Sequence, residues 1–327
     1  MTLTSPSIAI CICTYKRPQL LRHLLQGLAK QQFKRMPPPV LTIIVVDNEG
    51  NDEARIVCES EQPYQRGHLI YVRERQRGIS YARNTCLAHV PGDCDFIAMI
   101  DDDEFPEPHW LEQLIIVQRA TGADVVQGPV HAILPASAPN WMRQGKFFGW
   151  PYYLYSPKPI AWEDRTEISS ASTNNVLICW PRLRPLGLVF DTRLALSGGE
   201  DLMFFRQLRD AGFRFAFARN ANVSETVPPE RARFWYLCRV GFRDGCLKPA
   251  FKLLRNTDRG SLFQRLKRRS RSTGNGILHI LVGGYSLLRC AVFSRSSGYS
   301  LALASLSIVY GAGLVAGSFG LRYQHYK

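Results

Sequence analysis

The stretch Phe96-Ile-Ala-Met-Ile-Asp-Asp-Asp-Glu104 joins a short apolar run to four consecutive carboxylates. The apolar run is typical of a buried β-strand. Adjacent carboxylates repel one another, and their burial without a cation is costly. Because Mg²⁺ and Mn²⁺ take oxygen ligands and bridge to phosphates, Asp101 to Asp103 is a candidate metal–diphosphate site. The alternative is a solvated acidic turn or a helix cap ahead of Pro106.

Apolar runs and helical patterns alternate on either side of this stretch. Strands are predicted over 7–13, 41–46, 69–72 and 96–100, and helices over 18–32, 80–89 and 106–119. This alternation predicts an α/β fold with a mostly parallel central sheet flanked by helices. Thr14 and Arg17 follow the first strand, and Asp47 follows the second. Since ligands of open α/β sheets bind beyond the carboxyl ends of strands, we expect these side chains to converge.

A second pair of carboxylates, Glu200-Asp201, follows Gly198-Gly199 at the start of a predicted helix that ends near Asp210. A carboxylate in this position can act as a general base if it faces a substrate hydroxyl. The alternative is ordinary capping of the helix. The preceding stretch, 171–179, turns from polar to apolar and predicts a strand that enters the core.

An aromatic-rich segment lies between these two acidic sites. Its aromatic residues are Trp141, Phe147, Phe148, Trp150, Tyr152, Tyr153, Tyr155 and Trp162. They would form either a sugar-stacking or lipid-facing lip, or a loop folded over the core. No G-x-G-x-x-G and no P-loop motif follows a predicted strand, which argues against a dinucleotide enzyme or a kinase.

The positive charge of the chain is concentrated near its C-terminus. The 327 residues carry a formal net charge of +14, and 46% are hydrophobic and 21% charged, which excludes a wholly disordered chain. Residues 231–275 hold 13 basic and two acidic residues, a net +11, so the remainder carries +3. This segment would attract an anionic membrane or, as an alternative, a nucleic acid. No helix-turn-helix, zinc-finger or RNP motif supports nucleic-acid binding.

An apolar tail follows the basic segment. Residues 296–321 contain no charged side chain over 26 positions, and the shorter apolar stretch 277–293 is interrupted by Arg289. About 20 apolar residues suffice to cross a bilayer, and a basic run beside an apolar one is typical of membrane attachment. The stretch 277–293 would be a second span, a re-entrant piece or a helix in the membrane plane. The alternative is a pair of buried helices in a soluble domain.

The N-terminus and the cysteines indicate a cytosolic catalytic body. No signal peptide is recognisable, because the apolar run that starts at Ile8 is too short. The nine cysteines form no C-x-x-C pair and suggest neither a disulfide framework nor a zinc site.

Five motifs in this order resemble the family 2 glycosyltransferases of the GT-A fold, over about residues 7–245. The motifs are Cys13-Thr-Tyr-Lys-Arg-Pro18, Ile44-Val-Val-Asp-Asn48, Gly78-Ile-Ser-Tyr-Ala-Arg-Asn84, Asp101-Asp-Asp-Glu104 and Gly198-Gly-Glu-Asp201. The segments 223–231 and 239–245 are similar to bacterial succinoglycan-type exopolysaccharide glucosyltransferases. The resemblance implies an inverting sugar transfer from a nucleotide sugar, most often a UDP-sugar, to a lipid-linked or glycan acceptor.

The resemblance also implies roles for individual residues. The donor-binding residues would be Thr14, Arg17, Asp47, Arg77, Arg83, Asp101 and Asp102. Asp103, with Asp101, would hold a Mg²⁺ or Mn²⁺ ion. Asp201 would be the catalytic base beside Glu200, and the acceptor would contact Asn174, Asn175 and Trp150. Some GT-A enzymes add a histidine ligand to the metal; here that region reads Val223-Ser-Glu225, so Glu225 would replace it or the diphosphate would suffice.

These inferences predict three regions and a location. A catalytic domain would cover residues 1–230, with a nucleotide-sugar half over 1–130 and an acceptor half over 131–230. A basic membrane-proximal segment would cover 231–275, and a membrane-associated tail 276–327. The protein would work at the cytoplasmic face of a bacterial inner membrane, without nucleic acid and in an undetermined oligomeric state. The alternative enzyme class is a sugar-nucleotide nucleotidyltransferase, which would carry an N-terminal glycine-rich phosphate loop that Cys11 to Pro18 lacks.

Overall fold

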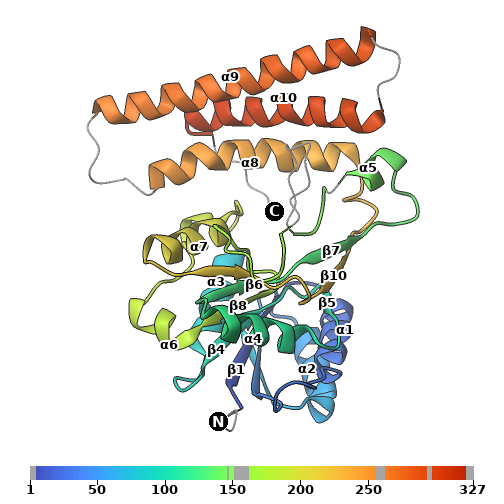
Figure 1. The fold of residues 1–327 in the computed structure, drawn as a ribbon, viewed down its shortest axis with the longest axis vertical. Coiled ribbons are helices and arrows are strands. Elements are labelled where there is room, and N and C mark those ends of the chain that lie inside the picture. Colours follow the sequence, from blue (N-terminus) through green and yellow to red (C-terminus); the bar gives the residue numbers. More distant parts are fainter. Residues whose placement is uncertain (1–4, 146, 151–161, 255–261, 293–296, 322–327) are drawn as a thin grey trace. The chain divides into compact units, whose positions relative to one another are not determined.

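The structure is a computed structural model that describes residues 5–145, 147–150, 162–254, 262–292 and 297–321. The chain divides into two compact units, drawn in Figure 1. The first comprises residues 1–132 and 161–226, and the second comprises 133–160 and 227–325. The described residues 133–145 and 147–150 therefore group with the C-terminal helices, and the predicted domain boundary at residue 230 stays a prediction.

A seven-stranded sheet forms the centre of the first unit, with the strand order β3-β2-β1-β4-β8-β6-β9. Its strands are β1 (Ser7–Thr14), β2 (Val40–Asp47), β3 (His68–Arg73), β4 (Phe96–Met99), β6 (Val125–Gln127), β8 (Val176–Cys179) and β9 (Phe215–Phe217). Only β8 runs antiparallel to its two neighbours, β4 and β6. The predicted α/β class with a mostly parallel sheet is confirmed.

The central strands form because their residues are apolar on both faces. Ile8, Ile10 and Ile12 on one face of β1 are buried, and so are Ala9 and Cys11 on the other face, as expected for a parallel strand covered by helices on both sides. β1 and β2 pair in register from Ser7 with Val40 to Thr14 with Asp47, so their polar carboxyl ends lie side by side.

Helices and short 3₁₀ turns connect these strands. They are α1 (Pro18–Ala29), α2 (Glu53–Glu61), η1 (Gln62–Tyr64), α3 (Ile79–Ala88), α4 (Trp110–Thr121), α6 (Trp180–Leu183), η2 (Arg184–Leu186), η3 (Thr192–Leu194) and α7 (Glu200–Asp210). Pro18 starts α1, where its fixed φ suits the first turn, and the leucine stripe of this helix is buried. α3 packs against β1 and β2, and α4 against β6, β8 and β9.

A second, three-stranded sheet has the order β5-β10-β7, with β5 (Glu104–Pro106), β10 (Val223–Thr226) and β7 (Val130–Ile133). The helix predicted from Pro106 starts only at Trp110, because Glu104 to Pro106 pair with β10 instead. The strand predicted over 171–179 starts only at Val176, because Asn175 has a positive φ of 61° that ends the preceding loop.

The second unit consists of α5 (Asn140–Gln144), α8 (Phe234–Leu254), α9 (Leu262–Val292) and α10 (Gly298–Ser318). α10 packs against both α8 and α9, and lies between them in Figure 1. Residues 269–292 and 298–318 are long and apolar enough to cross a membrane by length and composition alone. Trp141 and Phe147 of the aromatic-rich segment pack edge to face in this unit, whereas Tyr152, Tyr153 and Tyr155 lie outside the described residues.

Candidate active site

The carboxylates after β4 are held by the residues that follow β1. Thr14 Oγ1 donates a hydrogen bond of 2.8 Å to Asp102 Oδ2, and Arg17 Nη1 contacts Asp102 Oδ1 at 3.0 Å and Asp103 Oδ2 at 2.8 Å. Burial raises the pKa of Asp102 to about 6, with Arg17 opposing the shift and Asp103 adding to it. Burial alone would lower the pKa of Arg17, but the charges of Asp102 and Asp103 raise it above its ordinary value. Three predicted donor residues, Thr14, Arg17 and Asp102, therefore form one partly buried network that holds Asp103 through Arg17.

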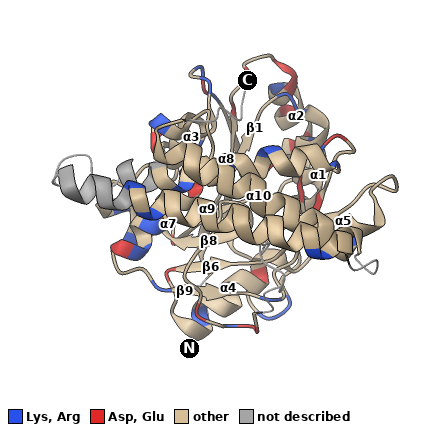
Figure 2. Ribbon diagram, turned by 90° about the horizontal axis from the view of Figure 1, so that it is seen from above, with Lys and Arg blue, Asp and Glu red and all other residues tan. Residues whose placement is uncertain are grey.

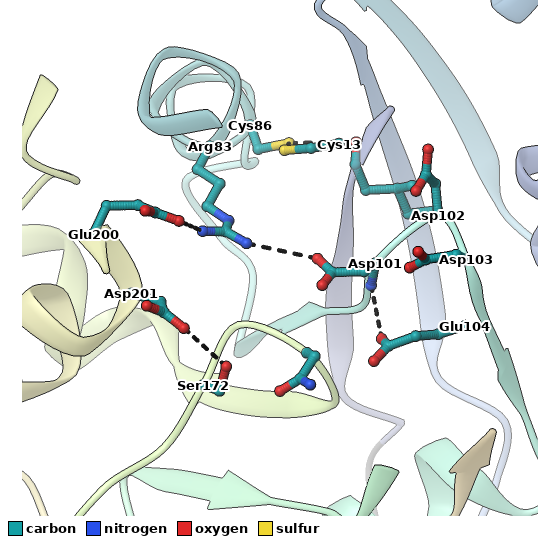
Figure 3. A network of polar contacts seen from close by, with 12 residues as sticks. Cys13, Arg83, Cys86, Asp101, Asp102, Asp103, Glu104, Ser172, Glu200 and Asp201 are labelled. Carbon is teal, nitrogen blue, oxygen red and sulfur yellow. Dashed lines mark hydrogen bonds and ion pairs between the residues drawn. The ribbon is translucent and has the colours of Figure 1, made fainter. Parts of the chain in front are cut away.

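Arg83 of α3 joins the two acidic sites that are far apart in the sequence. Its Nη1 donates to the Glu200 carboxylate, and its Nη2 lies 3.6 Å from Asp101 Oδ1, as Figure 3 shows. The guanidinium is buried, and although burial lowers its pKa, Glu200 and Asp101 raise it well above the ordinary value. The fold thus brings Asp101 and Glu200 to opposite sides of a single permanent cation.

Burial also changes the acidity of Glu200. It raises the pKa of Glu200 to about 7; Arg83 opposes this shift and Asp201 adds to it. Glu200 Oε2 is buried and has no hydrogen-bond partner among the described residues. An unpaired buried carboxylate oxygen of this kind is costly, which agrees with the raised pKa of Glu200.

Asp201 lies beside Glu200 at the start of α7, and its carboxylate is held on both oxygens. Oδ2 accepts from Ser172 Oγ at 2.9 Å, and Oδ1 accepts from the Leu202 backbone N–H at 2.7 Å. Gly199 precedes the helix at φ 83°, a conformation that favours glycine and turns the chain sharply into α7. The carboxylate is only partly buried, so it has both a fixed orientation and an open side.

Sequence reasoning missed Ser172 and the residue that supports it. Gln127 is completely buried; its Oε1 accepts from the Ser172 N–H at 2.8 Å, and its Nε2 donates to the Asn174 carbonyl at 2.6 Å. This amide therefore fixes the loop that presents Ser172 to Asp201. No local pattern could have indicated it, because Gln127 and Ser172 are 45 residues apart.

The two predicted acceptor asparagines have different environments. Asn175 is fully buried, and its side chain accepts from Trp110 Nε1 at 2.6 Å and donates to the carbonyls of Pro129 and Ala221. Its amide is used within the fold and supports the loop. Asn174 Oδ1, by contrast, is buried without a hydrogen-bond partner among the described residues. Of the two, Asn174 is therefore the one suited to contact a ligand.

The predicted nucleotide side lies at the end of β2. Asp47 is buried and accepts from Tyr71 Oη at 2.9 Å. Asn48, the next residue, accepts from the Gly78 N–H at 2.7 Å and so braces the loop that carries Arg77. The Arg77 guanidinium lies 5.8 Å from the centre of the Tyr15 ring, next to the end of β1.

The acidic cluster has the chemistry of a partial metal site. Among the described residues, no group of three or more His, Cys, Asp or Glu side chains is arranged to hold an ion by itself. The Asp101 side chain is 41% exposed. Desolvation of its carboxylate by the surrounding protein raises its pKa, Arg83 opposes this shift, and the charges of Asp103 and Asp201 add to it. A divalent cation would relieve this repulsion, so the carboxylates of Asp101 and Asp103 have the chemistry to hold one, with further ligands from outside the described side chains.

Two further carboxylates stand behind this pair. Glu104 is buried, and its Oε2 accepts from the Asp101 N–H at 2.8 Å. The strand register places Glu225 directly opposite Glu104. Burial raises the pKa of Glu104 well above its ordinary value, with Asp101, Asp103 and Glu225 adding to the shift. Glu225 therefore lies next to the acidic cluster, in the region where the sequence lacks the histidine.

Trp150, the last predicted acceptor residue, belongs to the second unit and is partly exposed there. Its contact with an acceptor stays a prediction.

Known proteins resemble this chain both in sequence and in fold. The sequence pattern of the family described as "Glycosyl transferase family 2" matches residues 9–177. The succinoglycan biosynthesis protein ExoM of Rhizobium meliloti is 38% identical over 238 residues, which is 73% of this chain and 72% of that protein. The glucosyl-dolichyl phosphate glucuronosyltransferase of Haloferax volcanii is 29% identical over 76% of this chain and 78% of its own length.

Solved structures share the fold at low sequence identity. The mannosyltransferase PcManGT from Pyrobaculum calidifontis, in complex with GDP-Man and Mn²⁺, superposes with a TM-score of 0.61 at 15% identity, covering 97% of this chain and 88% of that one. S. aureus TarS with UDP-GlcNAc gives a TM-score of 0.54 at 15% identity, with 96% and 91% covered. The matching family description over half of the chain, together with the 38% identity to ExoM, shows that this protein is a glycosyltransferase and belongs to glycosyl transferase family 2.

Proposed function

We propose that this enzyme transfers a sugar, with inversion at the anomeric carbon, from a UDP-sugar to a lipid-linked or glycan acceptor in bacterial exopolysaccharide or glycolipid synthesis. The Arg83 bridge between Asp101 and Glu200 is the observation that supports this most, because it brings a donor-side and an acceptor-side carboxylate into one site. The name of the relative ExoM supports the exopolysaccharide part, and the UDP-GlcNAc complex of TarS supports the donor class.

Asp201 is the proposed general base. The acceptor hydroxyl oxygen attacks the anomeric carbon from the face opposite the nucleotide, and its proton passes to the Asp201 carboxylate. The bond from the anomeric carbon to the diphosphate oxygen breaks, and its electron pair leaves with the nucleoside diphosphate. Ser172 and the Leu202 N–H orient the base, Glu200 holds the Arg83 guanidinium, and Asn174 Oδ1 is an acceptor for a further sugar hydroxyl.

Asp101 and Asp103 are the proposed metal-binding residues. A bound Mg²⁺ or Mn²⁺ would neutralise the negative charge that grows on the leaving diphosphate. Arg17 holds Asp103 in place, and Arg83 keeps a positive charge beside Asp101. Asp47 at the end of β2, and Arg77 in the loop before α3, would line the nucleotide pocket.

The proposed acceptor class follows from the second unit. Two of its helices are long and apolar enough for a membrane, and residues 231–275 are strongly basic. A cytoplasmic enzyme that uses a soluble nucleotide sugar would meet a lipid-linked acceptor at the inner membrane. We therefore propose attachment at the cytoplasmic face.

The metal assignment is tested by donor binding. Purified protein is titrated with UDP-glucose, UDP-GlcNAc and GDP-mannose by calorimetry, with and without Mn²⁺. We expect one donor to bind at least tenfold more tightly with Mn²⁺, and Asp103→Ala to lose this difference. Glu107→Ala, at an exposed carboxylate beyond β5, is the matched control and should retain it. Equal binding with and without Mn²⁺ in the wild type would count against a metal-assisted donor site.

A further inference from the structure

One face of α9 is apolar and exposed. Seven large side chains lie along it at helical spacing, with exposed fractions between 49% for Ile277 and 75% for Val292. They are Ile277, Leu278, Leu281, Val282, Tyr285, Leu288 and Val292. Apolar patches of this extent on a protein surface indicate a partner or a membrane. We call this set the α9 stripe.

α10, in contrast, is an inner helix of the second unit. An added Cβ at Gly313 would lie 2.3 Å from the Phe242 carbonyl oxygen of α8, and one at Gly317 would lie 2.4 Å from the Cys246 carbonyl oxygen. On its other side, an added Cβ at Gly311 would lie 2.5 Å from the Gly276 carbonyl oxygen of α9. Small residues therefore let α10 pack closely between α8 and α9. If α10 entered a membrane, α8 and α9 would have to enter with it.

Charged and polar side chains of α8 lie next to the middle of α10. Lys248 Nζ donates to Tyr310 Oη at 3.1 Å, near the midpoint of α10. Lys248 also lines a pocket of about 280 Å³, together with Ser272, Asn275, Leu278, His279 and Leu314. α8 also carries exposed Arg239 and the Arg243–Asp244 ion pair. Burying α10 across a bilayer would bring these charges into the hydrocarbon region, where charged side chains are costly and rare.

We propose that the second unit does not span the membrane but lies on one leaflet, with the α9 stripe in the acyl boundary and α10 held inside the protein. The partner is the surface of an anionic bilayer. Arg269 and Arg271 are exposed near one end of the described part of α9, and Arg289 lies in the last turn of this helix. At both ends these arginines can contact lipid headgroups. Figure 2 shows that most of α9 and α10 between these ends carries no charge. The proposal rests on the membrane association proposed above, but not on the sugar chemistry.

Vesicle flotation tests the surface. Full-length protein is mixed with vesicles of phosphatidylcholine alone or with 30% phosphatidylglycerol. We expect binding mainly to the anionic vesicles, and Leu281→Glu/Leu288→Glu to lower the bound fraction at least tenfold. Ile56→Glu/Val189→Glu, at two equally exposed apolar side chains of the first unit, is the matched control and should bind like the wild type. Equal binding of both double variants would overturn the assignment of the stripe, and equal binding to neutral vesicles would overturn its anionic partner.

Side-specific labelling separates the in-plane arrangement from a spanning one. Ser300 lies in the first turn of α10, which a two-span hairpin would carry across the membrane. In a background in which the partly exposed Cys13, Cys179 and Cys290 are replaced by alanine, Ser300→Cys should react with an impermeant maleimide in inverted membrane vesicles but not in intact spheroplasts. Labelling in spheroplasts would overturn the proposal. Because α9 lies outside the first unit, Leu281→Glu/Leu288→Glu should keep wild-type donor binding by calorimetry in detergent, so a loss of docking is distinguishable from a failure of the proposed donor site.

Discussion

Asp201 and Glu200 are neighbours in the chain, but the fold gives them different environments. Asp201 is partly exposed and oriented by Ser172, whereas Glu200 is buried against Arg83. A base must reach its substrate, and a buried carboxylate beside an arginine is better suited to hold that arginine in place. The structure therefore favours Asp201 as the base and Glu200 as a residue that supports it.

Ser172 should affect turnover rather than donor binding. In Ser172→Ala, Asp201 loses one of the two hydrogen bonds that orient its carboxylate. Loss of positioning in an active site typically lowers rates, and we expect kcat to fall about tenfold with little change in donor KM. Steady-state kinetics measure this, with Ser169→Ala, at an exposed serine of the same loop region, as the control. An unchanged kcat would show that Asp201 needs no such support.

Glu200 should make stability depend on pH. Its pKa in the folded state is about 7, above the ordinary 4.5, so the folded protein favours the protonated form. The associated stability is complete below pH 4.5 and is lost as the pH rises through 7. At about 1.4 kcal/mol per pKa unit, the difference amounts to roughly 3 kcal/mol. Urea denaturation between pH 4.5 and 8 should show a flatter pH dependence for Glu200→Gln than for the wild type; parallel curves would contradict the shift.

At the scale of elements, the sequence predicted the long, apolar strands well. β1, β2, β3 and β4 begin and end within a residue or two of the predicted ranges, because each is a continuous apolar run between polar residues. The three-residue strands β5, β6 and β9 were not predicted, because so short a segment has no periodicity to detect. Their pairing depends on distant partners, as Glu104 pairs with Glu225 across 121 positions of the chain.

The helix packing of the second unit can be tested at single glycines. Ala normally stabilises an exposed helix position by about 1 kcal/mol relative to Gly. Gly284 of α9 has open space around an added Cβ, so Gly284→Ala should be neutral or stabilising. Gly313→Ala places a methyl group 2.3 Å from the Phe242 carbonyl oxygen and should lower stability by about 1–3 kcal/mol. Thermal unfolding in detergent compares the two variants, and an equal Tm would contradict the close approach of α8 and α10.

At the scale of the whole molecule, the sequence indicated where acidic, basic and apolar residues are concentrated more fully than it indicated the architecture. The near-neutral body contains the paired acidic sites, and the +11 segment leads into the apolar helices. Motif order, through the GT-A resemblance, assigns roles to these carboxylates, and those roles stay predictions. The contacts of Gln127 with Ser172 and of Asn175 with Trp110 could not be predicted, because each joins residues that carry no local pattern.

The most direct test of the account is turnover by Asp201→Asn. Membranes containing the full-length protein and native acceptors are supplied with the donor identified by calorimetry and Mn²⁺, and release of nucleoside diphosphate is followed. A general base typically contributes about 10²–10⁴ in rate, so we expect transfer to fall at least 100-fold while donor affinity stays within twofold of the wild type. Full turnover by Asp201→Asn would contradict the assignment of the base, and release of pyrophosphate in place of nucleoside diphosphate would contradict the sugar transfer itself.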